Sequence, residues 1–324
     1  MSGRVLALTT AVWLSSCGGS DALLQDATGR YRLLARSTAP TEQVFEPARE
    51  HPGAVVAFAH DWRTGAAART MVRPKHGLAD GYAIVVDASS DVAPPEDRHD
   101  AFVVPDTGAA VAIELALLHC HGQSLPRHLP LGASILLPGG RSQRQPAPGN
   151  YVLELLHRQH AELLTTTPRL DVVFRLGFVR MAEDDAFRRA TGEAAAAAAR
   201  FPQLDLVRRT GDGTAATQLR LGRALLAEGC RALLVVSDDP PELAPLATAC
   251  AEQRAALILV DADRVCEHAT CTVGADAEML GRAGGEAVKV LAPNGAELFE
   301  FAVDLTAERS QRIQRGFATA LGLH

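Results

Sequence analysis

Polar side chains follow several short aliphatic runs of this chain, where they could bind a small molecule rich in hydroxyl groups. Asp61 and Asp87 follow runs in the first half of the chain, and Asp185, Ser237 and Asp261 follow runs in the second half. Carboxylate and hydroxyl oxygens accept hydrogen bonds from hydroxyl groups. Parallel strands end at one edge of a sheet, where ligands bind. We therefore expect these five side chains to line a binding site.

An aspartate at the end of a strand can also cap the next helix instead of binding a ligand. This structural role is an alternative for each of these aspartates, and above all for Asp87.

Other chemistry is not supported by the residue spacings. His119 and His121 are two positions apart and do not share a helix face, while His157 and His160 share a face but have no third ligand at matching spacing. There is no G-x-S-x-G motif, and the glycine-rich segment 211–214 lacks the lysine of a phosphate-binding loop. We expect no metal, no cofactor and no catalytic residues, so the protein is not predicted to be an enzyme.

The elements that must position these residues alternate between short aliphatic runs and helical segments. This alternation predicts an α/β fold with two doubly wound parallel-sheet lobes, because strands that are aliphatic throughout must be covered on both faces. The expected strands are 31–35, 55–59, 83–86, 101–104, 170–179, 204–208, 232–236, 256–260, 271–273 and 298–303. The expected helices are 42–50, 62–72, 106–121, 151–164, 185–200, 214–228, 241–254, 277–291 and 307–321.

Composition limits the possible partners. The chain has 324 residues, 47% of them hydrophobic, with a net charge of -6 and a pI near 6.0. A chain with this net negative charge lacks the excess of positive charge that is typical of nucleic-acid-binding proteins. No segment after residue 20 is long and apolar enough to cross a bilayer.

The first nineteen residues are typical of an export signal. Arg4 precedes the apolar run 5–14, and the sequence Leu14-Ser15-Ser16-Cys17 resembles the lipobox of bacterial lipoproteins. We predict a lipoprotein-type signal and tether over 1–19, with Cys17 as the lipidated residue and a periplasmic or extracytoplasmic location. An ordinary signal peptide is the alternative, and either signal exports the protein.

Five cysteines follow Cys17, and an exported protein can oxidise them. Cys266 and Cys271 bracket four residues and could close a disulfide loop. Cys230 and Cys250 could form a second bridge, which would leave Cys120 unpaired.

The second half of the chain resembles the beginning of the type 1 periplasmic binding proteins of the ribose and galactose class. Their first strand leads to an Asn/Asp-Pro-Phe element, and later strands carry G-x-D-A-I-I-I-x-P, I-P-V-V-x-x-D and V-x-x-D-N patterns before a helix with R-x-x-G-F. The corresponding segments here are FRLGF (174–178), DAF (185–187), GCRALLVVS (229–237), LILVD (257–261), VGAD (273–276) and ERSQR (308–312) with Gly316-Phe317.

The first half of the chain resembles the end of the same family. The segment HPGAVVAFAHD (51–61) is similar to the family's H-P-D-x-x-A-V-F-A-x-N-D, and AIVVD (83–87) is similar to V-V-G-F-D. The motifs are thus in cyclic order, which predicts a circularly permuted protein in which strand 31–35 lies beside strand 298–303.

This order implies lobes that combine distant segments. One lobe is expected from 21–103, 128–142 and 276–324, and the other from 104–127 and 151–275, with 143–150 as a linker.

The resemblance also implies the residues of the cleft. Asp185, Phe187, Asp261 and Arg312 would lie in it, with Asp61 and Asp87 facing them and Trp62 as a stacking surface. Arg188 stands where the ribose branch often has a second aromatic, so Arg188 and Arg312 together would also suit a carboxylate or phosphate. Phe187 could instead be a core residue, and both arginines could be surface residues.

The implied function is to close around a sugar, polyol or sugar acid and to deliver it to an ABC transporter permease. The alternative is a sensory subunit that presents the bound ligand to a receptor kinase or chemoreceptor. Either protein would be a monomer that contacts the membrane only through its lipid anchor.

Overall fold

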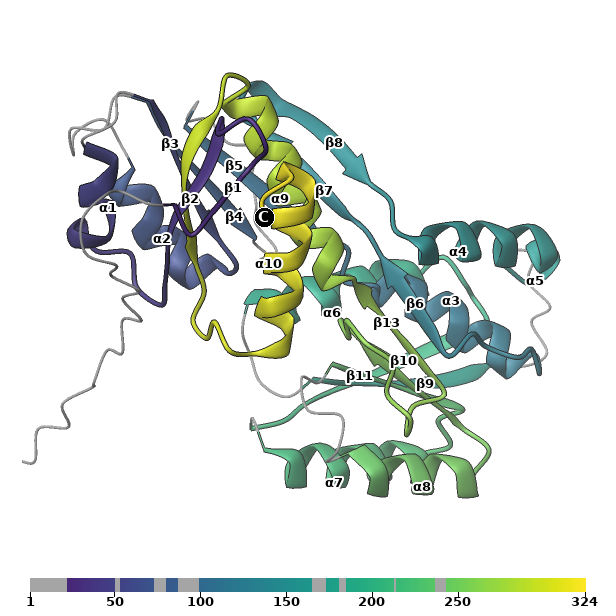
Figure 1. Ribbon diagram of the computed structural model, residues 1–324. Helices are drawn as coiled ribbons and strands as arrows, with labels where there is room; N and C mark the ends of the chain where they lie inside the picture. The colour runs from purple at the N-terminus through teal and green to yellow at the C-terminus, as the bar shows by residue number, and fades with distance from the viewer. Residues whose placement is uncertain are drawn as a thin grey trace, which may run out of the picture.

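The computed structural model describes residues 22–49, 53–72, 80–86, 99–164, 173–180, 185–212, 214–236 and 243–324. Within these ranges the chain forms two β-sheets that are flanked by helices and build two lobes (Figure 1). The fold class predicted from the sequence is confirmed.

The six-stranded lobe consists of parallel strands in the order β10-β9-β11-β12-β13-β6. The strands are β10 (Leu204–Thr210), β9 (Phe174–Arg180), β11 (Ala232–Val236), β12 (Ala256–Val260), β13 (Cys271–Ala275) and β6 (His128–Leu131). One apolar core includes α3 (Ala109–Cys120) and α6 (Asp185–Ala198). A second core, on the other face of the sheet, includes α7 (Ala215–Ala227) and α8 (Ala244–Glu252), which both lie beneath this sheet in Figure 1.

The eight-stranded lobe has the order β1-β2-β14-β3-β4-β5-β7-β8, and the five strands from β2 to β5 are parallel. The strands are β1 (Leu24–Gln25), β2 (Tyr31–Ser37), β14 (Ala296–Phe301), β3 (Ala54–Ala59), β4 (Asp80–Val86), β5 (Asp100–Pro105), β7 (Ala133–Leu137) and β8 (Arg141–Gln145). One face is covered by α9 (Ala277–Leu291) and α10 (Glu308–Leu321), and the other by α1 (Glu42–Arg49) and α2 (Trp62–Met71).

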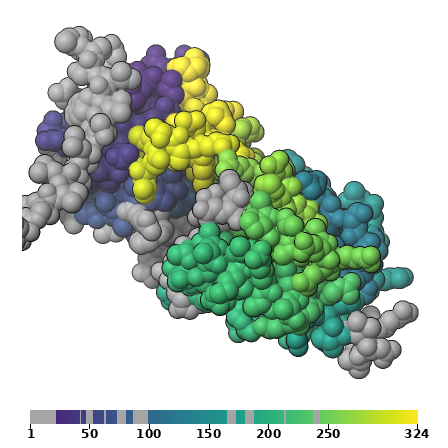
Figure 2. Space-filling view, turned by 90° about the horizontal axis from the view of Figure 1, so that it is seen from below, coloured from purple at the N-terminus to yellow at the C-terminus, as the bar shows by residue number. Residues whose placement is uncertain are grey.

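The two ends of the described chain meet in this eight-stranded sheet. β14 pairs with β2 on one side and with β3 on the other, so that Ala296 lies opposite both Tyr31 and Ala54. The predicted pairing of strand 31–35 with strand 298–303 is therefore confirmed. In the space-filling view the purple and yellow segments share one lobe, while the green segment forms most of the other (Figure 2).

Two predicted boundaries differ from the structure. Residues 128–142 do not all belong to the eight-stranded lobe, because β6 pairs with β13 and buries Leu129 and Leu131 in the six-stranded lobe. Gly132 then connects β6 to β7. A Cβ atom at Gly132 would lie 1.9 Å from the carbonyl oxygen of Gln145. The expected linker 143–150 is occupied by the end of β8 and the start of α4 (Pro148–Gln159), which α5 (Ala161–Leu164) follows.

Neither predicted disulfide is present, since the five described cysteines are buried free thiols. Cys266 packs in the core beside α7 and α8, whereas Cys271 packs in the core beside α3 and α6, on the opposite face of the sheet. Burial raises the pKa of Cys230 to about 11 and that of Cys250 to about 12. These thiols are protonated at neutral pH, and disulfide formation requires a thiolate.

Close packing of α9 against α10 depends on two glycines. A Cβ at Gly281 would lie 1.9 Å from the carbonyl oxygen of Ile313, and one at Gly316 would lie 1.9 Å from that of Glu278. These helices cover the sheet in which the two ends of the described chain meet, so their spacing determines how that sheet is packed.

We expect Gly281→Ala and Gly316→Ala each to lower the free energy of unfolding by at least about 1–3 kcal/mol, because the added methyl group has no room. Gly192→Ala is the matched control. Gly192 is an exposed residue of α6, and a Cβ there would meet nothing within 4 Å, so alanine should stabilise the helix by up to about 1 kcal/mol. Urea unfolding measures the free energy of unfolding of all three variants. Equal stability of the three would contradict the close packing of α9 against α10 at these glycines.

Candidate functional site

Asp261 follows β12 at the carboxyl edge of the six-stranded sheet and adopts a left-handed backbone conformation with φ of 60°. Its N–H donates to the carbonyl oxygen of Thr107 at 3.2 Å, and the N–H of Ala262 donates to Val273 at 3.2 Å. The neighbouring Gly274 is required by this turn, since a Cβ there would lie 2.6 Å from the nitrogen of Ala262. The half-buried Asp261 is thus held by backbone contacts on both sides of the turn.

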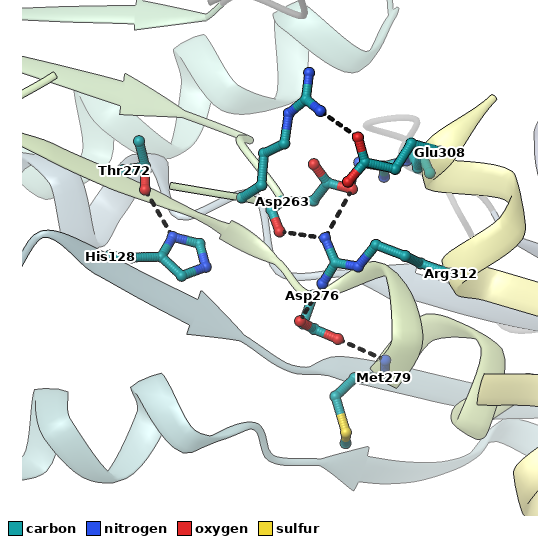
Figure 3. Close-up of polar contacts among 9 residues, drawn as sticks. His128, Asp263, Thr272, Asp276, Met279, Glu308 and Arg312 are labelled. Atoms are coloured by element: carbon teal, nitrogen blue, oxygen red, sulfur yellow. Dashed lines mark hydrogen bonds and ion pairs between the residues drawn. The ribbon is translucent and has the colours of Figure 1, made fainter. Parts of the chain in front are cut away.

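Arg312 of α10 reaches across to the loop that follows β12, as Figure 3 shows. Its Nη1 donates to the carbonyl oxygen of Asp263 at 2.8 Å, and its Nη2 donates to Oδ2 of Asp276 at 2.6 Å. The side chain is 18% exposed. In this structure the guanidinium therefore binds two groups of the protein itself.

Asp276 links this arginine to the start of α9. While Oδ2 accepts from Arg312, Oδ1 accepts from the N–H of Met279 at 2.9 Å, so Asp276 is also the N-cap of α9. One carboxylate thereby holds α9 and α10, two helices of the eight-stranded lobe, to the end of β13.

Further ion pairs connect the loop after β12 with α10. Arg264 pairs with Glu308, and Asp263 lies 3.5 Å from Arg312 and 3.8 Å from Arg309. Figure 3 shows Asp263 beside Arg312. We call Asp263, Arg264, Asp276, Glu308 and Arg312 the Arg312 cluster. It joins a loop of the six-stranded lobe to a helix of the eight-stranded lobe.

His128 of β6 lies beside the Arg312 cluster. Its Nδ1 is 2.6 Å from Oγ1 of Thr272 on the neighbouring strand β13. Burial lowers the pKa of His128, and the positive charge of Arg312 lowers it further, whereas the carboxylates of Asp276 and Asp263 oppose the shift. The direction shows that burial dominates.

At the carboxyl edge of the eight-stranded sheet, Asp61 caps α2. Its Oδ1 accepts from the N–H of Thr64 at 2.9 Å, and its Oδ2 lies 3.3 Å from the N–H of Val303. The helix-cap alternative for Asp61 is therefore realised in the structure.

The other predicted ligand residues are described in part or not at all. Arg188 is exposed on α6. Asp185 and Phe187 begin α6 and Trp62 begins α2, but their side chains lie outside the described part of the chain. Ser237, Asp87 and Cys17 lie outside the described residues altogether.

The guanidinium of Arg312 binds Asp263, which is two positions after Asp261 in the sequence. The hydrogen bonds of Asp61 to Thr64 and Val303 instead stay within the eight-stranded lobe. Arg312 precedes Gly316 by four positions, one more than in the R-x-x-G-F pattern.

Asp263 and His128 were missed by sequence reasoning, and Asp276 was recognised only as part of a motif. The N-cap rule could have found Asp276, because it stands directly before an apolar helical segment. No local signal identifies His128, whose environment is set by residues more than 130 positions away. Among the described residues, no group of three or more His, Cys, Asp or Glu is arranged to hold a metal ion.

A protein-family model matches part of the chain. Residues 176–322, somewhat less than half of the sequence, match the periplasmic binding protein domain family. No curated protein matches the chain.

Solved structures show weaker similarity. An ABC transporter solute-binding protein from Mycobacterium smegmatis with bound glycerol is 25% identical over 46% of this chain and 51% of that chain, with a TM-score of 0.39. The fructose-binding periplasmic domain of a hybrid two-component system is 18% identical over 46% and 49%, with a TM-score of 0.35. An extracellular ligand-binding receptor from Verminephrobacter eiseniae is 13% identical over 86% and 62%, with a TM-score of 0.31.

The alignments span about half the length of the first two structures, and every TM-score is below 0.5. The assignment of the fold therefore rests on the sheet topology of the two lobes. The matched segment begins in β9 and ends just after α10, so a periplasmic binding protein domain match runs from the six-stranded lobe into the eight-stranded lobe.

We expect substitutions in the Arg312 cluster to move the pKa of His128 in opposite directions. Arg312→Gln removes a positive charge and should raise this pKa, while Asp276→Asn removes a negative charge and should lower it further. NMR titration of the His128 ring protons measures both shifts. Lys289→Gln, on the last turn of α9, is the control that should leave the pKa unchanged.

The same titration has a consequence for stability. Because the folded pKa lies below the unfolded value of about 6.5, protonation favours the unfolded chain, and the contribution of neutral His128 is lost as the pH falls below about 6.5. Shifts of the same sign in Arg312→Gln and Asp276→Asn would contradict the assigned environment.

Proposed function

We propose that this protein is an extracytoplasmic solute-binding protein of the type 1 periplasmic class that closes around a sugar or sugar-like polyol. The observation that carries the proposal is a strand order shared by both lobes. In the six-stranded sheet the order β10-β9-β11-β12-β13 reads 2-1-3-4-5 along the chain. The eight-stranded sheet gives the same order from β2-β14-β3-β4-β5 when β14 is counted first and β2 second.

This shared order also supports a circular permutation. The repeat in the eight-stranded lobe is regular only if β14 and α10 precede β2, as they would in an unpermuted relative. We infer that the two ends of the described chain correspond to a surface connection of such a relative, where a break is tolerated.

Binding would take place between the carboxyl edges of the two parallel sheets. Asp185, Phe187, Arg188, Ser237 and Asp261 would contribute from the six-stranded lobe. Asp61, Trp62, Asp87 and Arg312 would contribute from the other lobe. Ligand would stabilise the closed form because contacts from both lobes are complete only when the cleft is shut. No bond chemistry is needed for this role.

We further propose that the closed protein delivers its solute to an ABC transporter permease while Cys17 anchors it to the membrane through lipid. No helix among the described residues is long and apolar enough to span a bilayer. Copurification with a permease after crosslinking would support delivery, whereas copurification with a receptor kinase would support the sensory alternative.

We expect a polyhydroxylated solute to raise the melting temperature of the purified protein. The probes are ribose, glucose, sorbitol and gluconate, and a ligand at about a hundred times its Kd adds about 2.7 kcal/mol to the free energy of unfolding. Asp261→Asn should bind the solute at least about tenfold more weakly than the wild type, because hydrogen bonds to a charged group contribute about 1.5–3 kcal/mol. Asparagine tolerates the left-handed conformation at this position.

The matched control is Glu252→Gln, an exposed carboxylate at the end of α8, near the opposite edge of the sheet. It should respond like the wild type. An unchanged melting temperature with every probe would contradict the proposed function, while a wild-type response of Asp261→Asn would remove only that residue from the site.

A further inference from the structure

Four connections of the described chain pass between the two lobes, and two of them lie directly beside each other. Gly132 connects β6 to β7, and residues 146–147 connect β8 to α4, as Figure 1 shows. Ala133 pairs with Gln145, which brings these two connections together. The other two connections follow β5 and β13.

The helix α4 is fixed to the six-stranded lobe. A Cβ at Gly149 would lie 2.4 Å from the carbonyl oxygen of Pro130 on β6, so the first turn of α4 lies directly on the backbone of that strand. Leu156 of α4 packs against the core beside α3 and α6, and Nε2 of His157 lies 2.8 Å from Oε2 of Glu114 on α3. The preceding strand β8, in contrast, pairs with β7 in the eight-stranded lobe.

Asn150 joins the two neighbouring connections. Its Oδ1 accepts from the N–H of Ala147 at 2.8 Å and from the N–H of Gly132 at 3.1 Å. Gly132 is buried, so loss of this acceptor would remove the hydrogen bond of a buried donor, which is unfavourable. One side-chain oxygen thus ties the connection after β8 to the connection after β6.

The connection from β8 to α4 is also stiff. Pro146 and Pro148 each fix their own φ, and Pro148 favours an extended conformation of the residue before it. Ala147 accordingly has φ of -107° and ψ of 169°, and its side chain is buried. A stiff connection transmits a displacement between the parts that it joins, whereas a glycine-rich one would absorb it.

Gly132 contacts a third connection as well. Its carbonyl oxygen accepts from the N–H of Asp106, after β5, at 3.1 Å. The carbonyl oxygen of Leu131 accepts from the N–H of Asp276, after β13, at 2.9 Å. All four connections are therefore linked by hydrogen bonds or strand pairing around Gly132.

We propose that residues 146–150, which we call the brace, restrict the relative motion of the two lobes. Hinge motion requires the connecting residues to change φ and ψ. The brace adds a stiff connection, and through Asn150 it also holds Gly132, so Asn150 is a positioning residue of the hinge. The relevance of the brace to solute binding rests on the proposed function, because it limits the open forms from which the cleft would close.

The decisive variant is Asn150→Ala, which removes the acceptor shared by Gly132 and Ala147. Asn150→Asp keeps an acceptor oxygen there, and its negative charge suits the start of a helix. Thr214→Ala is the matched control. It removes the N-cap of α7, where Oγ1 of Thr214 accepts from the N–H of Thr217 at 3.3 Å, within the six-stranded lobe.

Double electron–electron resonance measures the distances between the lobes in the ligand-free protein. The spin labels replace Glu252 on α8 and Lys289 on α9, two exposed residues of opposite lobes, and are attached through unnatural amino acids so that the native cysteines stay unmodified. We expect Asn150→Ala to broaden the distance distribution. Asn150→Asp and Thr214→Ala should both keep the wild-type distribution.

Amide hydrogen exchange gives a second readout at the hinge itself. The N–H of Gly132 should exchange at least about tenfold faster in Asn150→Ala than in the wild type, because a buried hydrogen bond is lost. Asn150→Asp and Thr214→Ala should leave this rate unchanged.

Three outcomes would overturn the inference: a wild-type distance distribution in a folded Asn150→Ala, a distribution in Asn150→Asp as broad as in Asn150→Ala, or an equal broadening in Thr214→Ala, which would attribute the effect to loss of a helix cap. If Asn150→Ala does not fold, Pro146→Gly decides, since it loosens the brace at an exposed residue and retains the contacts of Asn150. Broadening in Pro146→Gly would support the brace, and an unchanged distribution would overturn it.

These measurements separate the inference from the proposed function. None of them requires a ligand, so a failure of the inference leaves the proposed function standing. A protein that binds none of the sugars would overturn the proposed function and leave the distance and exchange results as they are.

Discussion

The pairing of β14 with β2 is the contact on which the architecture depends. β14 is buried along its whole length and lies between β2 and β3. Two ion pairs fix its register with β2, from Arg32 to Glu297 at 3.2 Å and from Arg36 to Glu300 at 2.6 Å. The register shifts by one residue between them. Without this irregularity Arg36 would face the other side of the sheet, because side chains alternate along a strand.

Much of the fold could be predicted because short sequence segments indicate its strands and because the family-like motifs occur in cyclic order. Aliphatic runs such as 232–236 and 256–260 became β11 and β12 without change, and the order of the family-like motifs predicted that the two ends of the chain share a sheet. Assignment of β6 to the wrong lobe shows the limit. Its four residues carry no indication of which sheet they join, and the choice depends on pairing with Thr272 and its neighbours far along the chain.

The candidate site was less predictable, because the role of each polar residue depends on partners that are distant in sequence. Asp61 could be recognised as polar and at a strand end, but only the structure shows that it caps α2. Arg312 was assigned to ligand by resemblance, and its contacts with Asp263 and Asp276 could not be derived from spacing. His60 stands beside Asp61 in the sequence, yet its significance depends on Glu300, which is 240 residues away.

Buried charges at the carboxyl edge of the eight-stranded sheet are better explained by orientation than by stability. Replacing a buried ion pair with apolar residues of similar volume is often neutral or stabilising, so such a pair is weak evidence for a stabilising role. Arg36 and His60 each bind one carboxylate oxygen of Glu300, and these contacts orient the His60 ring in a way that an apolar core cannot. The same strand pairing that joins the two ends of the chain thereby orients a histidine side chain at the edge where we propose that ligand binds.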